Sequence, residues 1–282
     1  MKGSADRRTK AGTRMKDAGK GREGVRPKKA LGQHFLTDPA IARRIADALS
    51  GGTENEPAPV LEIGCGTGVL TRPLLERGDI ALYGSEIDRE SIAFLHERLP
   101  RFACRLIEGD FLSLDLAERF PDGVRIIGNF PYNISSQILF RIIRYRDFVP
   151  EAVGMFQREV ALRIASSPGS RDYGILSVLL QAWYEVEYLF TVDEHVFSPP
   201  PKVKSAVVRL RRNGTGALEC DEKLFVTVVK AAFGQRRKTL RNALRAVFGA
   251  MGGAEHPFFG RRAETLSVAE FVELTGWVAG HK

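Results

Sequence analysis

The chain has no apolar run close to the roughly 20 residues that a helix needs to cross a bilayer. Arg141 and Arg144 interrupt the apolar stretch at 138–143, and Gln181 ends the one at 175–180. A membrane-spanning protein is therefore not expected. At 282 residues with 44% hydrophobic content, the chain can form one large domain or two smaller ones around a core.

Cysteine is also scarce, and histidine is not clustered. The three cysteines, Cys65, Cys104 and Cys220, are odd in number and far apart, so they form neither a disulfide framework nor a zinc pattern. None of the five histidines has metal-ligand spacing. We expect a cytoplasmic protein in a reducing compartment, with no metal site.

Acidic residues are rare at the amino terminus. Residues 1–29 hold eleven Lys and Arg against three acids, which accounts for the whole net charge of +8. They have almost no large apolar side chains, and they lack both the apolar core of a secretory signal and the amphipathic face of a transit peptide. We predict a disordered basic arm over 1–29 that steers the protein toward a polyanion; the alternative is a merely solubilising tail.

A second basic region lies near the carboxyl terminus. Residues 202–250 contain twelve basic and three acidic groups. This clustering of basic residues predicts that one face of the protein binds a phosphate backbone and that another face has a different function.

Between these regions, strand and helix patterns alternate, which predicts an α/β fold with a mainly parallel sheet covered on both faces. A helix is expected at 38–50, with Asp38 as its N-cap, and the later helices near Val69, Glu90, Ser136 and Arg158. An antiparallel pair from 186–192 and 206–211 should close the sheet. We predict domains at 30–212 and 213–282, the second small and helical, and strands at 60–63, 81–86, 102–107, 124–128 and 152–156.

The stretch from Glu62 to Gly68 lies at the first strand-to-helix turn. Gly64, Gly66 and Gly68 allow a tight turn and a close backbone approach to a ligand. A nicotinamide-binding loop would need glycine where Val69 stands. Glu62 disfavours a pyrophosphate and suits a cationic ligand, such as the sulfonium and amino group of S-adenosylmethionine.

The ends of the next strands carry further polar side chains. Glu86 ends the second strand, where a carboxylate can grip two ribose hydroxyls. Asp110 ends the third, where it can accept from an adenine amino group, and Asn129 ends the fourth. Any one of them is unremarkable as a surface polar residue, but their succession along one sheet edge predicts a cofactor site.

The segment Asn129-Phe130-Pro131-Tyr132 fits an exocyclic amine on a planar base. The Asn129 side-chain oxygen and the Phe130 carbonyl can accept from an NH2 group, and Tyr132 offers a stacking face. Pro131 stiffens the corner. Alone, the segment is equally typical of a strand-ending turn.

With these residues in place, the chain resembles the KsgA-type ribosomal RNA adenine N6-dimethyltransferases, relatives of the macrolide-resistance rRNA methyltransferases. The resemblance covers about residues 27–282 and implies a Rossmann-like class I methyltransferase sheet with a small C-terminal helical domain. It rests on the segments 31–36, 62–68, 129–132, 157–161, 197–203 and 232–242.

The resemblance implies S-adenosylmethionine as the methyl donor, with His34 and Leu36 lining its site beside Gly64, Glu86, Asp110 and Asn129. It implies that Phe197 stacks on the target base, although a core aromatic is the alternative. The implied substrate is two adjacent adenosines in a hairpin loop near the 3′ end of small-subunit rRNA, in an immature 30S subunit. A monomer is expected.

Two positions depart from the family pattern. Phe130 stands where Leu or Ile is usual, which we expect to be tolerated, and Lys204 replaces a common acidic residue. Arg237, Arg241 and Arg245 recur every four residues and predict one basic helical stripe without neutralising acids, although a solvated face is the alternative. The expected RNA-binding residues are Lys202, Lys204, Arg236, Arg237, Lys238, Arg241 and Arg245.

Two other function classes remain open at this level. A non-catalytic ribosome-assembly or nucleic-acid-binding factor could use the same fold, but the complete set of Glu86, Asp110 and Asn129 to Tyr132 favours catalysis. A small-molecule methyltransferase would leave the basic C-terminal region unexplained.

Overall fold

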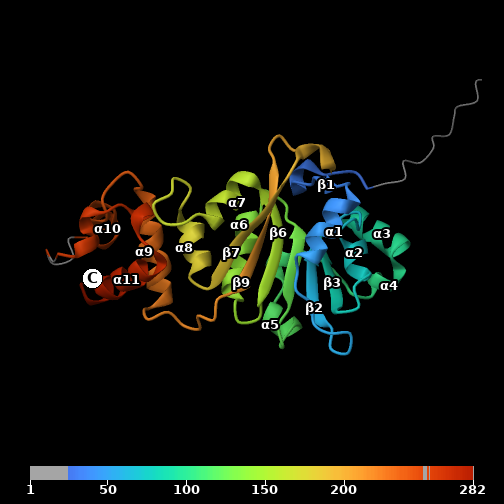
Figure 1. Cartoon of the computed structure of the whole chain (residues 1–282), viewed down its shortest axis with the longest axis horizontal. Helices are drawn as coiled ribbons and strands as arrows, with labels where there is room; N and C mark the ends of the chain where they lie inside the picture. Colours follow the sequence, from blue (N-terminus) through green and yellow to red (C-terminus); the bar gives the residue numbers. More distant parts are fainter. Residues whose placement is uncertain (1–24, 250–252, 254, 282) are drawn as a thin grey trace, which may run out of the picture.

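The computed structural model describes residues 25–249, 253 and 255–281. Most of the predicted basic arm, residues 1–24, therefore lies outside the described residues. Figure 1 shows a sheet with helices packed on it and, at one end of the molecule, the C-terminal helices α9 to α11. The predicted domain boundary at 213 falls between the last strand and α9.

The sheet has seven strands in the order β4-β3-β2-β5-β6-β9-β7. All neighbouring pairs from β4 to β6 are parallel, while β9 is antiparallel to both β6 and β7. The fold class is confirmed, with one refinement: the antiparallel strand lies inside the sheet and β7 forms the edge. The strands are β2 Ala58–Ile63, β3 Ile80–Glu86, β4 Leu106–Glu108, β5 Arg125–Asn129, β6 Glu151–Gln157, β7 Tyr184–Val192 and β9 Ser205–Arg212.

The helices largely begin where the sequence predicts. Asp38 caps α1 by accepting from the backbone N–H groups of Ala40 and Ile41. One expected strand start, at Phe102, is wrong because Pro100 begins a short helix there and Phe102 packs into the core. The helices are α1 Pro39–Asp47, α2 Thr71–Leu75, α3 Arg89–Arg98, α4 Pro100–Ala103, α5 Leu116–Arg119, α6 Ser135–Arg144, α7 Arg158–Ala165, α8 Ile175–Gln181, α9 Glu222–Gly234, α10 Leu240–Phe248 and α11 Val268–His281.

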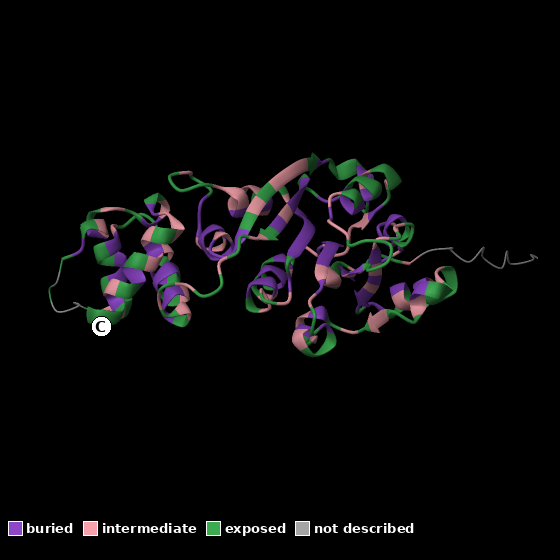
Figure 2. Ribbon diagram, turned by 60° about the horizontal axis from the view of Figure 1, so that its bottom comes forward, coloured by how far each residue is buried: buried purple, intermediate pink, exposed green. Residues whose placement is uncertain are grey.

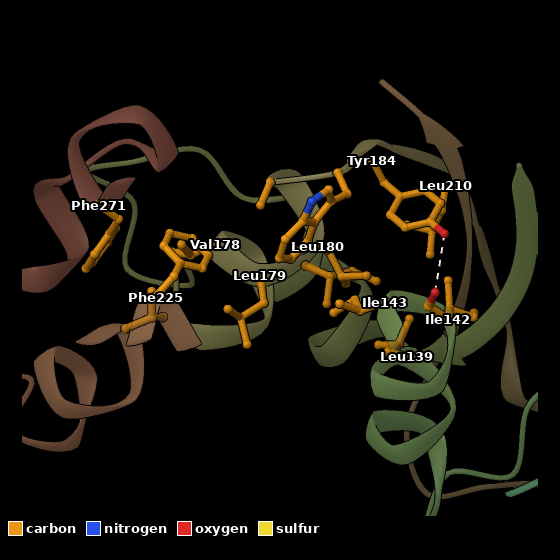
Figure 3. Close-up of a cluster of buried hydrophobic side chains, with 14 of the residues drawn as sticks. Leu139, Ile142, Ile143, Val178, Leu179, Leu180, Tyr184, Leu210, Phe225 and Phe271 are labelled. Carbon is orange, nitrogen blue, oxygen red and sulfur yellow. Dashed lines mark hydrogen bonds between the residues drawn. The ribbon is translucent and has the colours of Figure 1, made fainter. Parts of the chain in front are cut away.

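The central strands β2, β5 and β6 and most of β9 are buried, whereas the edge strands β4 and β7 are largely half-buried or exposed (Figure 2). Successive side chains alternate between two core clusters: Val60 packs with residues of α1 to α3, whereas Leu61 packs with residues of α6 to α8. The second cluster continues into the C-terminal helices, where Phe225 and Phe271 join it (Figure 3). The C-terminal helices thus share a core with the sheet, which fixes one part of the molecule against the other.

Two features complete the frame. A short ribbon of β1 Phe35–Leu36 and β8 Phe197–Ser198 joins segments far apart in the sequence at the strand-end side of the sheet. Among the described residues, no helix has the length and apolarity that a membrane span requires.

Candidate active site

A cavity of about 180 Å³ opens at the carboxyl ends of β2, β3 and β5. This edge is where open α/β sheets bind ligands. Its walls come from five segments of the chain: residues 31–35, the glycine loop, the end of β3, residues 109–112 and residues 129–134.

The glycine loop adopts the backbone that the sequence predicts. Gly64, Gly66 and Gly68 have φ values of 73°, 54° and 76°, in the left-handed region that favours glycine. Gly64 and Gly66 line the cavity. Gly68 does not: a Cβ there would meet Leu99, which lies between α3 and α4, at 3.0 Å, so its role is close packing.

Glu62 lies beneath the loop instead of in the cavity. It is 1% exposed, and its Oε2 accepts a hydrogen bond of 2.7 Å from the Thr71 hydroxyl. Burial raises the pKa of Glu62 to about 7. The sequence predicted that Glu62 contacts a cationic ligand. The structure does not place it there, because the side chain at this position of β2 is directed into the protein.

Glu86 is the carboxylate that the fold does hold at the cavity. Its Oε2 accepts from the Gly66 N–H at 2.8 Å, and its Oε1 accepts from the N–H groups of Ile87 and Asp88 at 2.9 Å. Burial raises the pKa of Glu86, and these backbone hydrogen bonds oppose that effect. The carboxylate is thereby fixed in a geometry that can bind a diol.

Asp110 lines the cavity at the end of the next strand. Its Oδ1 accepts from the Leu112 N–H at 2.9 Å, which caps the short helix at Phe111–Ser113. Among the described residues no donor contacts its Oδ2, so this oxygen can accept from an amino group.

The side chain of Asn129 has a defined orientation. Its Nδ2 donates to the His34 carbonyl at 2.8 Å, and a carbonyl can only accept, so the Oδ1 is the atom left for a ligand. No described donor bonds the Phe130 carbonyl either. Two acceptors from successive residues therefore stand beside the cavity.

Tyr132 and His34 form the next part of the wall. Their rings lie 5.5 Å apart at 28°, and the Tyr132 hydroxyl bonds to Ser205. The His34 Nδ1 donates to the Pro199 carbonyl at 2.8 Å. Because a carbonyl oxygen can only accept a hydrogen bond, the proton of the His34 ring lies on Nδ1.

Besides Glu62 and Gly68, two further predicted site residues do not reach the cavity. Leu36 and Phe197 pair in the β1–β8 ribbon, and each is 4% exposed inside the core cluster around Val207. Stacking of Phe197 on a base would require its side chain to leave this cluster. Residues that sequence reasoning missed include Gln33 and Asn133; the available signal was that Gln33 lies in the 31–36 segment and that Asn133 directly follows the 129–132 segment.

The predicted basic stripe is wrong. Arg237 lies in the turn before α10, which begins only at Leu240, so it does not share a helical face with Arg241 and Arg245. No acid is interleaved between Arg237 and Arg245, as expected, but Glu255 from outside this segment pairs with Arg241.

Two more of the basic residues have local partners. Lys204 pairs with Asp193 at 2.6 Å, and Arg236 donates to the Arg171 carbonyl. In the described part of the chain, no carboxylate lies within ion-pair distance of Lys202, Arg237, Lys238 or Arg245, and all four are exposed.

The sequence profile of the family described as "Ribosomal RNA adenine dimethylase" matches residues 24–272. The chain belongs to this family. It is 57% identical over 255 residues to ribosomal RNA small subunit methyltransferase A of Porphyromonas gingivalis, which covers 89% of this chain and 97% of that protein. It is 54% identical to the protein of the same name from Cytophaga hutchinsonii, over 92% of this chain and 99% of that protein.

Solved structures agree with this family assignment. A dimethyladenosine transferase from Plasmodium falciparum superimposes with a TM-score of 0.71 at 27% identity, over 86% of this chain and 96% of that one. The 23S rRNA methyltransferase ErmE gives a TM-score of 0.62 at 27% identity, over 85% and 99%. The resemblance seen in the sequence and the expectation of an rRNA-methylating enzyme are confirmed, and a non-catalytic protein is not favoured.

Proposed function

We propose that the protein transfers methyl groups from S-adenosylmethionine to N6 of two adjacent adenosines in a hairpin loop near the 3′ end of the small-subunit (16S) rRNA. Its substrate is an immature 30S subunit, and it acts as a cytoplasmic monomer. The observation that carries the proposal is the pair of acceptors formed by the Asn129 Oδ1 and the Phe130 carbonyl, in the same cavity as Glu86.

The residues at the cavity fit the methyl donor. Glu86 would hold the ribose hydroxyls, Asp110 the adenine amino group, and the backbone at Gly64 and Gly66 permits close approach. When bound, S-adenosylmethionine supplies an electrophilic methyl group. Glu62 takes no direct part, since it is buried beneath the loop.

The chain's own contribution to the reaction is to orient the amine. The lone pair of adenine N6 is delocalised into the ring, which makes it a poor nucleophile. Hydrogen bonds to the Asn129 Oδ1 and the Phe130 carbonyl hold both N–H groups and direct the lone pair toward the methyl carbon. S-adenosylmethionine would supply the methyl group and leave as the neutral thioether, and N6 would release one proton to solvent for each methyl group that it gains.

We call the Asn129 Oδ1 and the Phe130 carbonyl the amine clamp. The second methylation uses this clamp with one N–H fewer. N6-methyladenosine can donate to only one of the two acceptors, and the other then faces the first methyl group. The target base must leave its stack to enter the pocket, where Tyr132 lines the wall.

Exposed basic side chains support binding of an rRNA backbone. Lys202, Arg237, Lys238 and Arg245 have no described carboxylate partner, so their charges are available to phosphates. Lys204, Arg236 and Arg241 already have local partners, and we assign them a smaller part.

Incubation with isotopically labelled S-adenosylmethionine and undermethylated small subunits tests the proposal. Label should appear as N6,N6-dimethyladenosine in the small-subunit rRNA. Cofactor binding without transfer to any RNA would contradict the proposal and favour the assembly-factor alternative. Label on large-subunit RNA alone would contradict the proposed substrate.

A further inference from the structure

Residues 26–35 form a strap across one side of the cavity. Leu31, Gly32, Gln33, His34 and Phe35 from this strap line the cavity directly. The strap is fastened to the rest of the chain at two places, and the two lie on different sides of the proposed site.

The first fastening is an ion-pair cluster at the turn between β3 and α3. The Lys28 ammonium pairs with Asp88 and, at 3.3 Å, with Glu90. The Gln33 Nε2 donates to the second Asp88 oxygen at 3.3 Å, and the Gln33 Oε1 accepts from the Lys28 N–H at 2.7 Å. We call Lys28, Gln33 and Asp88 the latch.

Asp88 is suited to this task because it is only 2% exposed. Burial acts to raise the pKa of Asp88, but the hydrogen bonds from Lys28 and Gln33 help to hold that pKa below its usual value. Without Lys28 and Gln33, the buried Asp88 carboxylate would keep only two neutral donors, the Glu90 N–H and the Ser91 hydroxyl, and would lose its charged partner, which gives the latch a preference for the closed state.

The latch adjoins the carboxylate proposed to bind ribose. The Asp88 N–H donates to the Glu86 Oε1 at 2.9 Å, so one short turn carries both groups. Any movement that separates Lys28 from Asp88 therefore takes place at the ribose side of the cavity.

The second fastening is at the amine clamp. The His34 carbonyl accepts from the Asn129 side chain, and the His34 ring bonds to Pro199. Gly32 lies so close to Asn133 that a Cβ at this position would come within 2.5 Å of the Asn133 Oδ1. The strap thus connects the cofactor side of the cavity to the residues that orient the target amine.

We propose that the strap is a lid held by the latch, which opens for cofactor and product exchange, and that Lys28 and Gln33 are positioning residues for methyl transfer. Closure of the lid keeps the His34 carbonyl against Asn129, so the clamp is oriented when the lid is fastened. The inference rests on the proposed function, because it takes S-adenosylmethionine as the ligand beneath the lid.

The test measures how fast prebound tritiated S-adenosylmethionine leaves the full-length protein in an excess of unlabelled ligand. Lys28→Ala should release the label about tenfold faster than the unmodified protein, the change expected for a loss of about 1.4 kcal/mol. Lys28→Arg keeps the charge and the donors and should restore slow release. Lys29→Ala removes the same charge from the same strap, but Lys29 is exposed and has no described ion pair, so release should stay slow.

Release from Lys28→Ala at the unmodified rate would overturn the latch, as would equal acceleration by Lys29→Ala. At saturating cofactor, Lys28→Ala should also have a lower kcat with an unchanged affinity for the RNA. An unchanged kcat would contradict the positioning role. If the unmodified protein bound no label at all, the proposed function would fail and the latch with it. If it bound the label but Lys28→Ala released it at the unmodified rate, only the latch would fail.

Discussion

The side chain of Asn129 donates a hydrogen bond of 2.8 Å to the backbone carbonyl of His34, across 95 residues of sequence. This single contact decides which end of the amide faces the cavity. It leaves the oxygen, the atom that an exocyclic amine needs, beside the Phe130 carbonyl. The orientation does not depend on a ligand, so the clamp is organised in advance.

Removal of the clamp should abolish methyl transfer. We expect Asn129→Ala to lower kcat by about 10²–10³-fold, the usual effect of losing one well-placed group that stabilises a transition state. Binding to the small subunit should change little, because phosphate contacts dominate that affinity. Transfer assays and filter binding on the same preparations measure the two effects.

Asn213→Ala is the matched control for this change. Asn213 has the same side chain, but it is exposed in the segment between β9 and α9 and does not line the cavity. It should keep most of the activity. If Asn129→Ala also kept it, the amine clamp would be the wrong mechanism.

Glu62 should make the stability depend on pH. Burial raises its folded-state pKa to about 7 from an unfolded value near 4.5, so the folded protein holds this proton more tightly. Stability is therefore lost as the pH rises from about 4.5 through about 7, and the loss is complete above that range. The full effect is on the order of 3 kcal/mol.

Glu62→Gln should remove this dependence, since an amide can accept from Thr71 without carrying a charge. The difference in Tm between the variant and the unmodified protein should grow from pH 5 toward pH 8, as measured by calorimetry. Glu118→Gln, at an exposed position, is the control and should show no such growth. A constant difference for Glu62→Gln would contradict the raised pKa.

Phe130 should matter for stability more than for activity. Its ring is 1% exposed, packs edge-on against Phe156 at 5.2 Å and lies across Gly128 and Gly154, which pair in register on β5 and β6. Phe130→Leu should lower the free energy of unfolding by about 1–2 kcal/mol through lost ring contacts. Methyl transfer should persist, because the backbone carbonyl is unchanged.

The two glycines provide an independent check on this packing. A Cβ at Gly128 would lie 2.8 Å from the Phe130 ring, and one at Gly154 would lie closer still. Gly154→Ala should cost about 1–3 kcal/mol by overpacking. Part of that cost should disappear in the Phe130→Leu background; full additivity in denaturation experiments would show that the ring and the glycine do not interact.

RNA binding should distinguish paired from unpaired arginines. Arg237→Ala should weaken binding and flatten the dependence of log K on log salt by about 0.7–0.9. Arg241→Ala should have a smaller effect, since Arg241 must first leave Glu255. Titrations at several ionic strengths measure both slopes. Equal slopes for the two variants would show that the Arg241 ion pair does not persist in the complex.

The sequence predicted the fold class and the main site because both depend on regular repeats. Alternating strands and helices require a covered parallel sheet, and the ends of parallel strands meet at one edge, so Glu86, Asp110 and Asn129 had to come together. The loop glycines have the positive φ values that their spacing implied. The one early error in the strands arose where Pro100 began a helix.

The sequence by itself thus determined which edge of the sheet bears the site and which strand ends contribute to it. Only the tertiary structure decided which way each side chain faces. Glu62 and Phe197 carry the right chemistry but point into the core, and Arg237 lies outside the helix that carries Arg241. The reason is physical: a strand or helix pattern fixes the order of residues, whereas side-chain direction and partners depend on contacts between distant segments, such as those of His34 with Asn129 and of Lys28 with Asp88.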